Sequence, residues 1–148
     1  MLSLKLKSDE WVVVCDGAKA LMLTNVGDTK FPNLKMLSVR TQDDAPTREL
    51  GTERPGRVHE SKGHAHSAHE QTNWHDQAEE HFLQHVASDL ADHIGQGKIR
   101  DLTIVAPPRA LGMLRAHYTP ALRQVLRHEI AHDYVKLPVH EIEKLLTG

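Results

Sequence analysis

The chain has 148 residues, the length of one domain that is large enough to bury a hydrophobic core. An apolar fraction of 39% argues against wholesale disorder, and the formal net charge of −2 indicates no particular class of partner. The single cysteine, Cys15, excludes an intramolecular disulfide and fits a reducing compartment. The opening stretch, residues 1–6, alternates between apolar and polar residues, and charged residues soon follow, unlike in a signal peptide or a membrane span. We therefore expect a cytoplasmic protein with no membrane partner.

The first part of the chain predicts an antiparallel meander. Trp11 to Cys15 is a continuous apolar run, which is typical of a strand covered on both faces. Asp16-Gly17 follows it and precedes a second β-like run over residues 18–26. Asp-Gly between two such runs predicts a hairpin with a type I′ turn, in which both central residues have positive φ. A third strand is expected from Leu34 to Arg40.

From Thr41 to about Asn73 the hydrophobic pattern stops. This stretch contains only Leu50 and Val58 as sizeable aliphatic residues, beside several prolines and glycines. A structureless loop of this length is uncommon inside a compact domain and is usually functional or disordered. We therefore expect a mobile arm at about residues 41–73.

Helical and strand patterns alternate in the second half. From Trp74 onward, apolar residues recur at helical spacing until Gly95-Gln96-Gly97, which is a C-cap signal. The run 102–106 predicts another buried strand. Helices are expected over residues 107–117 and 120–128, the second with Thr119 as its N-cap, and an amphipathic helix is expected from 138. Residues 130–137 are interpreted as a strand, with a helix tail as the alternative. The order implies an α/β fold with a mixed central sheet, an N-terminal antiparallel meander and helices covering it.

Charge is segregated along the second half. Residues 63–97 contain acids but no Lys or Arg, whereas residues 98–128 contain six basic residues against one acid, Asp101. Arginines on consecutive helices can contact phosphates without reading sequence. Alternatively, the acidic helix packs beside the basic ones and the charges offset. The candidate RNA- or anion-binding residues are Arg54, Arg57 and Lys62 in the arm and Arg109, Arg115, Arg123 and Arg127 in the basic segment.

Histidine is the unusual residue, with twelve in total and eight of them between His59 and His93. Imidazole binds Zn, Ni and Cu, so His64 with His66, and His81 with His85, are weak metal-ligand candidates. No cysteine accompanies them, and no ligand pattern recurs. We expect a solvated, titratable surface with no dedicated metal and no cofactor.

No complete active site is expected. A two-metal nuclease needs converging carboxylates, but Asp16 follows its strand whereas Asp101 precedes its own, which separates them if the strands are parallel. Turn formation already explains Asp16. Pro107-Pro108-Arg109 lies where open α/β sheets bind ligands, yet two prolines more simply form a rigid corner. We expect Cys15 to be a core residue and not a nucleophile.

Three stretches carry a resemblance to a known family: Arg54-Pro55-Gly56-Arg57, Ala106 to Arg115, and Lys136 to Ile142. Together with the opening Trp11 to Ala18, they resemble the bacterial host attachment protein family over nearly the whole chain. The resemblance implies one domain over residues 1–148 and a role in attachment to host cells. It also implies a ribonuclease-H-like fold, similar to the middle domain of the eukaryotic release factor.

In that release factor, a Gly-Gly-Gln tip on a long loop enters the peptidyl transferase centre of the ribosome. The corresponding loop here, residues 60–67, has no Gly-Gly-Gln, so the resemblance does not imply peptidyl-tRNA hydrolysis. We expect a non-enzymatic protein that binds RNA or a ribosome-associated partner through the His-rich arm and the basic segment. The alternative is a protein-interaction or metal-responsive factor that supports attachment.

Overall fold

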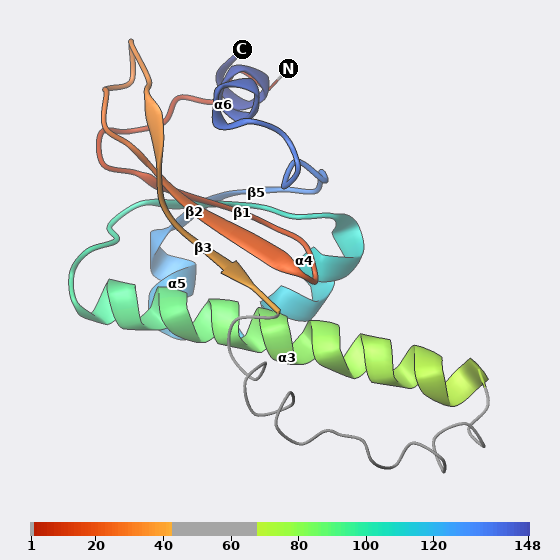
Figure 1. Ribbon diagram of the computed structural model, residues 1–148. Helices are drawn as coiled ribbons and strands as arrows, with labels where there is room; N and C mark the ends of the chain where they lie inside the picture. The colour runs from red at the N-terminus through yellow and green to blue at the C-terminus, as the bar shows by residue number, and fades with distance from the viewer. Residues whose placement is uncertain (1, 43–67) are drawn as a thin grey trace.

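The computed structural model describes residues 2–42 and 68–148 and shows an α/β architecture (Figure 1). Its mixed sheet has the strand order β3-β2-β1-β4-β5. The strands are β1 (Trp11–Cys15), β2 (Lys19–Asn25), β3 (Leu34–Thr41), β4 (Leu102–Val105) and β5 (Leu126–Ile130). The helices are α3 (Ala68–Gly95), α4 (Pro108–Arg115), α5 (Pro120–Val125) and α6 (Val139–Thr147). The predicted mixed sheet with an N-terminal meander is confirmed.

β1 is the central strand, as its continuous apolar sequence predicts. It pairs with β2 in antiparallel and with β4 in parallel orientation, and all five of its residues are buried. Trp11, Val13 and Cys15 point to one face of the sheet, and Val12 and Val14 point to the other. A hydrophobic core therefore lies on each face.

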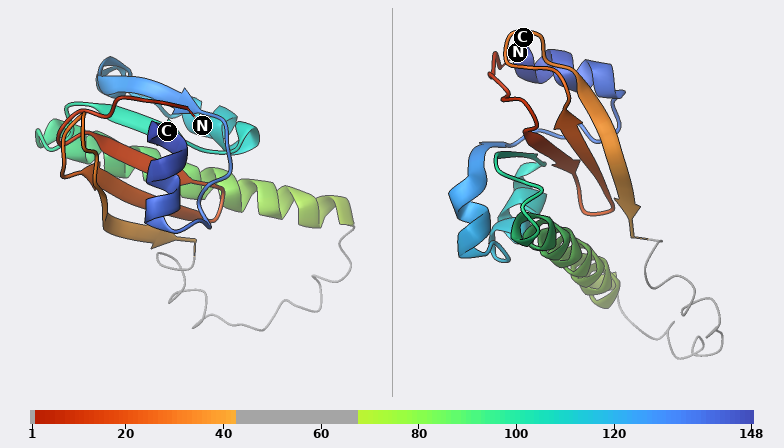
Figure 2. Two further views of the ribbon diagram at one scale, coloured as in Figure 1. Left: turned by 90° about the horizontal axis from the view of Figure 1, so that it is seen from above. Right: turned by 90° about the vertical axis from the view of Figure 1, so that its left-hand side faces the viewer.

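Helices cover both faces of the sheet (Figure 2). α3, α4 and α5 pack on the side of Trp11, where the α3 residues Phe82, Leu83 and Val86 are buried. α6 packs on the opposite side through Ile142 and other apolar residues. In the described part of the chain, no helix combines the length and the apolar character needed to cross a membrane.

The boundaries of α3 differ from the prediction. The helix begins at Ala68 rather than Trp74, so the predicted arm at 41–73 overlaps β3 and α3, and its centre, residues 43–67, lies outside the described residues. The predicted C-cap is confirmed, because Gly97 has a φ of 78° and its N–H donates to the Ile94 carbonyl oxygen at 3.0 Å. With 28 residues, α3 is about 42 Å long and projects past the sheet (Figure 1).

The hairpin between β1 and β2 forms as predicted, but the predicted type I′ turn is wrong. Neither Asp16 nor Gly17 has a positive φ. The turn is closed by a hydrogen bond of 2.9 Å from the Asp16 backbone N–H to the Lys19 carbonyl oxygen. Close packing explains the glycine instead, since a Cβ on Gly17 would lie 2.7 Å from Cγ of Glu79 in α3.

The region before α6 also departs from the prediction. The predicted helix 120–128 ends at Val125, and the strand lies at 126–130 rather than at 130–137. Leu126 to Ile130 have helix-forming side chains, but pairing of Glu129 and Ile130 with β4 overrides that local preference. Residues 131–137 instead form an irregular connection that buries Val135.

Candidate functional site

Asp16 serves the fold and does not form part of a carboxylate cluster with Asp101. Its Oδ1 accepts hydrogen bonds from the backbone N–H groups of Ala18 and Lys19, each at 2.9 Å. β1 and β4 are parallel with Trp11 opposite Leu102, so Asp101 lies at the other end of the sheet. The predicted separation of the two carboxylates is confirmed, and the pair offers no two-metal site.

Cys15 lies between the sheet and the helices of the α3 face and is fully buried. Burial, with a smaller contribution from the charge of Asp16, raises the pKa of its thiol to about 12. A thiol with so high a pKa carries almost no thiolate at neutral pH. The side chain is a core residue, as predicted.

The Pro107-Pro108 corner places Arg109 against the acidic helix. Pro108 starts α4, and the guanidinium of Arg109 forms ion pairs with Asp76 and Glu79 of α3, the latter at 3.0 Å. The charge of Arg109 is thus offset within the molecule. At this corner, the acidic helix packs beside a basic residue and their charges offset, which is the alternative to phosphate binding that the charge pattern left open.

Arg115 is engaged by Glu129 of β5. Its Nη2 donates to Oε1 of Glu129 at 2.9 Å, and the Tyr118 hydroxyl donates to Oε2 at 2.6 Å. The hydrogen bond from Arg115 holds the pKa of Glu129 below its usual value, and burial raises the pKa of Tyr118. The guanidinium carbon of Arg123 lies 5.4 Å from the Tyr118 ring centroid. Arg123 makes no ion pair with a residue that the structure describes.

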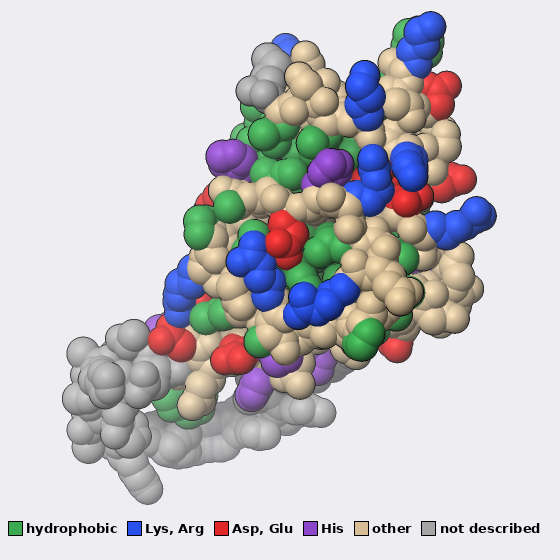
Figure 3. All heavy atoms as spheres, turned by 180° about the vertical axis from the view of Figure 1, so that it is seen from behind, with side chains coloured by type: hydrophobic (Ala, Val, Ile, Leu, Met, Phe, Trp, Pro, Cys, Tyr) green, Lys and Arg blue, Asp and Glu red, His purple; other side chains and the backbone are tan. Residues whose placement is uncertain are grey.

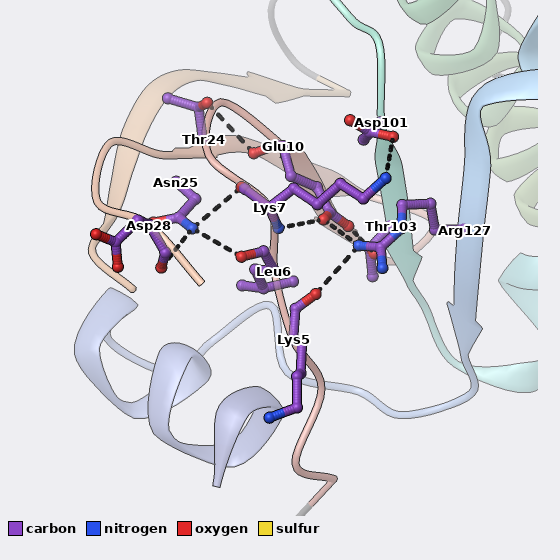
Figure 4. A network of polar contacts seen from close by, with 10 residues as sticks. All are labelled: Lys5, Leu6, Lys7, Glu10, Thr24, Asn25, Asp28, Asp101, Thr103 and Arg127. Atoms are coloured by element: carbon purple, nitrogen blue, oxygen red, sulfur yellow. Dashed lines mark hydrogen bonds and ion pairs between the residues drawn. The ribbon is translucent and has the colours of Figure 1, made fainter. Parts of the chain in front are cut away.

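Arg127 belongs to a buried network around Glu10 (Figure 4). Glu10 is 0% exposed, and its carboxylate accepts hydrogen bonds from the Lys7 backbone N–H at 2.8 Å, the Thr103 hydroxyl at 2.7 Å and Arg127. Arg127 also donates to the Lys5 carbonyl oxygen at 3.2 Å. A buried carboxylate must be paired and hydrogen-bonded to be tolerated. The network therefore joins the N-terminal segment to β1, β4 and β5.

A hollow of about 230 Å³ adjoins this network at the amino ends of β1 and β4. It is lined by Ser8, Asp9, Trp11, Thr24, Gly97, Lys98, Arg100 and Asp101. Asp101 lies 3.7 Å from the ammonium group of Lys7, whereas Lys98 and Arg100 make no ion pair with a described residue. These two cations are therefore more available to an anion than Arg109, Arg115 and Arg127 are.

The histidines do not converge in the described residues. His81 and His85 are exposed on α3, whereas His64 and His66 lie outside the described residues. No group of three or more His, Cys, Asp or Glu side chains in ranges 2–42 and 68–148 is placed to hold a metal ion. His93 packs on Trp11 with ring centroids 5.0 Å apart, which is a core contact.

The edge strand β3 carries an exposed apolar surface that sequence reasoning did not single out. Met36, Leu37 and Val39 are 45%, 49% and 42% exposed. We use the name β3 surface for five exposed apolar residues that lie on β3 and on the connection before it: Val26, Phe31, Met36, Leu37 and Val39. Only two other large hydrophobic side chains in the described residues, Leu2 and Trp74, are exposed. Three of the five lie on the eight-residue strand β3, and a concentration of exposed apolar side chains is typical of an interaction surface.

The connection that leads into β3 is held in a fixed conformation by Asn25. This buried side chain donates to the Leu6 and Lys7 carbonyl oxygens at 3.2 and 3.1 Å. Its Oδ1 accepts from the backbone N–H groups of Gly27 at 3.0 Å and Asn33 at 2.8 Å. The β3 surface is thus preorganised, which lowers the entropic cost of binding a partner.

Of the seven basic residues that the sequence indicated, the four that the structure describes do not form one cluster. Arg109, Arg115 and Arg127 pair with carboxylates at three different places, and Arg123 lies over the Tyr118 ring beside the Arg115–Glu129 pair. Arg54, Arg57 and Lys62 lie outside the described residues, so their role stays a prediction. Figure 3 shows Lys and Arg side chains interspersed with Asp and Glu on the face turned away in Figure 1.

A model of a protein family described as "Protein required for attachment to host cells" matches residues 11–146. The matched span runs from the start of β1 nearly to the end of α6 and so covers the whole sheet. No curated protein matches the chain.

Proposed function

The chain belongs to the family of proteins required for attachment to host cells, and we propose that it is a non-enzymatic protein-binding factor that recognises its partner through the β3 surface. The observation that carries this proposal is the gathering of exposed apolar side chains along an edge strand. An edge strand offers unpaired N–H and carbonyl groups to another strand, and exposed apolar side chains add affinity and specificity. A non-enzymatic role is supported by the separation of Asp16 from Asp101 and by the buried state of Cys15.

Protein binding is favoured over RNA binding by the ion pairs of the basic segment. Phosphate contacts draw their affinity from cations that release condensed counterions. Arg109, Arg115 and Arg127 already bind carboxylates, so an RNA would have to compete with those contacts. RNA or the ribosome remains a second candidate, supported by Arg123 and by Lys98 and Arg100 beside the hollow, which make no ion pair with a residue that the structure describes.

The test of the protein-binding proposal is complementation of attachment. A bacterial strain lacking the protein is given the native chain, the variant Met36→Lys/Val39→Lys, or the control Ala121→Lys/Gln124→Lys. The control adds the same charge at two exposed positions of α5. We expect the β3 variant to lose attachment while the control retains it, with equal amounts of folded protein for both. Equal attachment by the two variants would refute a role of the β3 surface.

The RNA alternative is separated by salt dependence. If RNA is the partner, affinity falls with salt by a log–log slope of about −0.7 for each phosphate contacted on a single strand. Replacing Lys98, Arg100 and Arg123 with Gln then flattens the slope, whereas replacing Arg109 alone changes it little. Ribosome co-sedimentation and RNA titration measure this. We expect no salt-steep binding, and its detection would move the function to RNA.

We further propose that the domain is ribonuclease-H-like and related to the middle domain of the eukaryotic release factor. What supports this is the mixed sheet, in which the antiparallel β1, β2 and β3 continue into the parallel β4 and β5. The motif resemblance around the Pro107-Pro108 corner points the same way. We also propose a cytoplasmic location, which the single cysteine supports.

A further inference from the structure

Met36 and Val39 lie on the same face of β3 although three positions separate them. Met36 is opposite Leu23 and Val39 is opposite Leu21, and both leucines belong to the core on the α6 face. Side chains of a regular strand alternate, so residues three apart point to opposite faces. The register shift between Met22 and Leu23, which leaves Leu37 without a partner on β2, accounts for the difference.

This irregularity limits what can pair with β3. No described strand lies on the outer side of β3. If a regular strand paired there, its side chains would face the same side of the sheet as their partners on β3 before Leu37. After Leu37 they would face the opposite side from their partners. A bulge commonly protects an edge in this way. A partner that fits along the whole edge must carry the same irregularity at the matching place.

We infer that the partner of the β3 surface is a second copy of this chain, paired antiparallel through β3 about a two-fold axis between Leu37 and Ser38. The inference rests on the proposed role of that surface and names its occupant. In this register Met36 of each copy is opposite Val39 of the other, so apolar side chains meet on the α6 face. The two irregularities then lie together at the axis and keep the alternation in phase on both sides.

Charge permits this register. It places Lys35 opposite Arg40 of the second copy, and both side chains lie on the α3 face. Arg40 is bound by Asp89 of its own chain, with Nε and Oδ2 2.7 Å apart. The lysine therefore meets an ion pair and not a free cation, which removes most of the repulsion that two opposed basic residues would otherwise produce.

The contact is small, so the dimer is a weak one. Two eight-residue strands bury less than the roughly 1,600 Å² of a standard stable interface. The dimer therefore forms and dissociates with protein concentration. Replacing Val39 with Lys places a charge in each apolar pair and shifts the protein to monomer.

Cysteine crosslinking tests the register directly. Two proteins are prepared, Met36→Cys and Val39→Cys, and the native Cys15 contributes little background because it is fully buried. Directly opposite residues have Cα atoms about 4.5–5.5 Å apart, within the range of a disulfide. Two copies of Met36 are displaced by three residues, or about 10 Å, which is beyond that range. We expect disulfide-linked dimers from the mixture and almost none from either protein alone.

Two further measurements complete the test. The pair Ala121→Cys and Gln124→Cys, at exposed positions of α5, gives the collision background for the mixture. Sedimentation equilibrium of the native chain should show an apparent mass that increases with protein concentration. The Val39→Lys variant should be a monomer at every concentration. A mixture that crosslinks no more than the α5 pair overturns the second-copy inference. If Met36→Lys/Val39→Lys still abolishes attachment in that case, β3 binds a different protein and the proposed function stands.

Discussion

The two edge strands of the sheet, β3 and β5, differ in whether their side chains have partners within the molecule. On β5 the charged side chains Arg127 and Glu129 each bind a partner of opposite charge within the molecule. On β3 the exposed side chains Met36, Leu37 and Val39 are apolar and point outward from the fold. The charged side chains of β5 are occupied by contacts within the molecule, whereas the exposed apolar side chains of β3 form the surface proposed to bind another protein.

The difference shows that a segment rich in basic residues does not necessarily have cations available to bind a phosphate. The basic segment 98–128 carries the largest run of positive charge in the described chain, yet its arginines mainly hold helices and strands together. Exposed ion pairs contribute little energy, but they still occupy the cations that a phosphate would need. If the comparison is right, changes at β5 reduce stability, whereas changes on β3 reduce binding.

The largest effect is expected at Arg127. The variant Arg127→Gln leaves Glu10 buried without its charged partner, and breaking such a pair costs about 3–5 kcal/mol. Urea unfolding at neutral pH measures the loss. Arg100→Gln is the matched control, because it removes the same charge from an exposed side chain without a described ion pair and should cost under about 0.5 kcal/mol.

A double variant shows whether the loss belongs to the pair. Glu10→Gln/Arg127→Gln removes both charges, so it should be more stable than Arg127→Gln alone. Lys7 and Thr103 bind different oxygens of Glu10, so in the variant the Lys7 backbone N–H can still donate to the amide oxygen and the Thr103 hydroxyl can accept from the amide NH2. If Arg127→Gln unfolds at the same urea concentration as Arg100→Gln, β5 is not held by this network and the contrast between the edges fails.

The second effect concerns the connection that leads into β3. A Cβ added at Gly27 would overlap the backbone carbonyl oxygen of Phe31, so Gly27→Ala forces the connection to shift. Overpacking of this kind costs about 1–3 kcal/mol. Gly112→Ala on α4 is the control, since nothing lies within 4 Å of its added Cβ and alanine favours a helix by about 0.5–1 kcal/mol. Thermal unfolding compares them, and equal midpoints would mean that the connection is not rigid.

The sequence predicts the parts of the fold that burial or capping dictates locally. β1 was predictable because a central strand is buried on both faces and so has no polar residue between Trp11 and Cys15. Gly97 and Thr119 mark a helix end and a helix start, and both roles are confirmed by their hydrogen bonds. β5 was not predictable, because its strand conformation comes from pairing with β4 and not from its own residues.

The candidate site was hidden for a related reason. Met36, Leu37 and Val39 have the composition of a buried strand, and only the place of β3 at the edge exposes them. Glu10 was also missed, although an acid directly before an apolar strand is a detectable signal. The arginines were conspicuous in the sequence, but their partners Asp76, Glu79 and Glu129 are distant in the chain and are brought to them only by folding.

The smallest effect is a pH dependence at Glu129. Its pKa in the folded protein lies below the reference value of 4.5, mainly because Arg115 donates a hydrogen bond to the carboxylate. The unfolded chain therefore takes up a proton at higher pH than the folded chain, so this contribution is present above the unfolded pKa and is lost as pH falls through the folded pKa. Because the pair is largely solvated, its contribution at neutral pH is below about 1 kcal/mol.

The variant Glu129→Gln isolates that contribution. We expect it to be less stable than the native protein at about pH 7, and we expect the difference to shrink between about pH 7 and pH 3 as the native carboxylate becomes protonated. Urea unfolding of both proteins across this range gives the difference at each pH. Glu141→Gln, which removes a carboxylate at an exposed position of α6 without a described ion pair, is the matched control. A Glu129→Gln difference that stays constant or grows on acidification would mean that Arg115 is free in solution, and the basic segment would again be open to RNA.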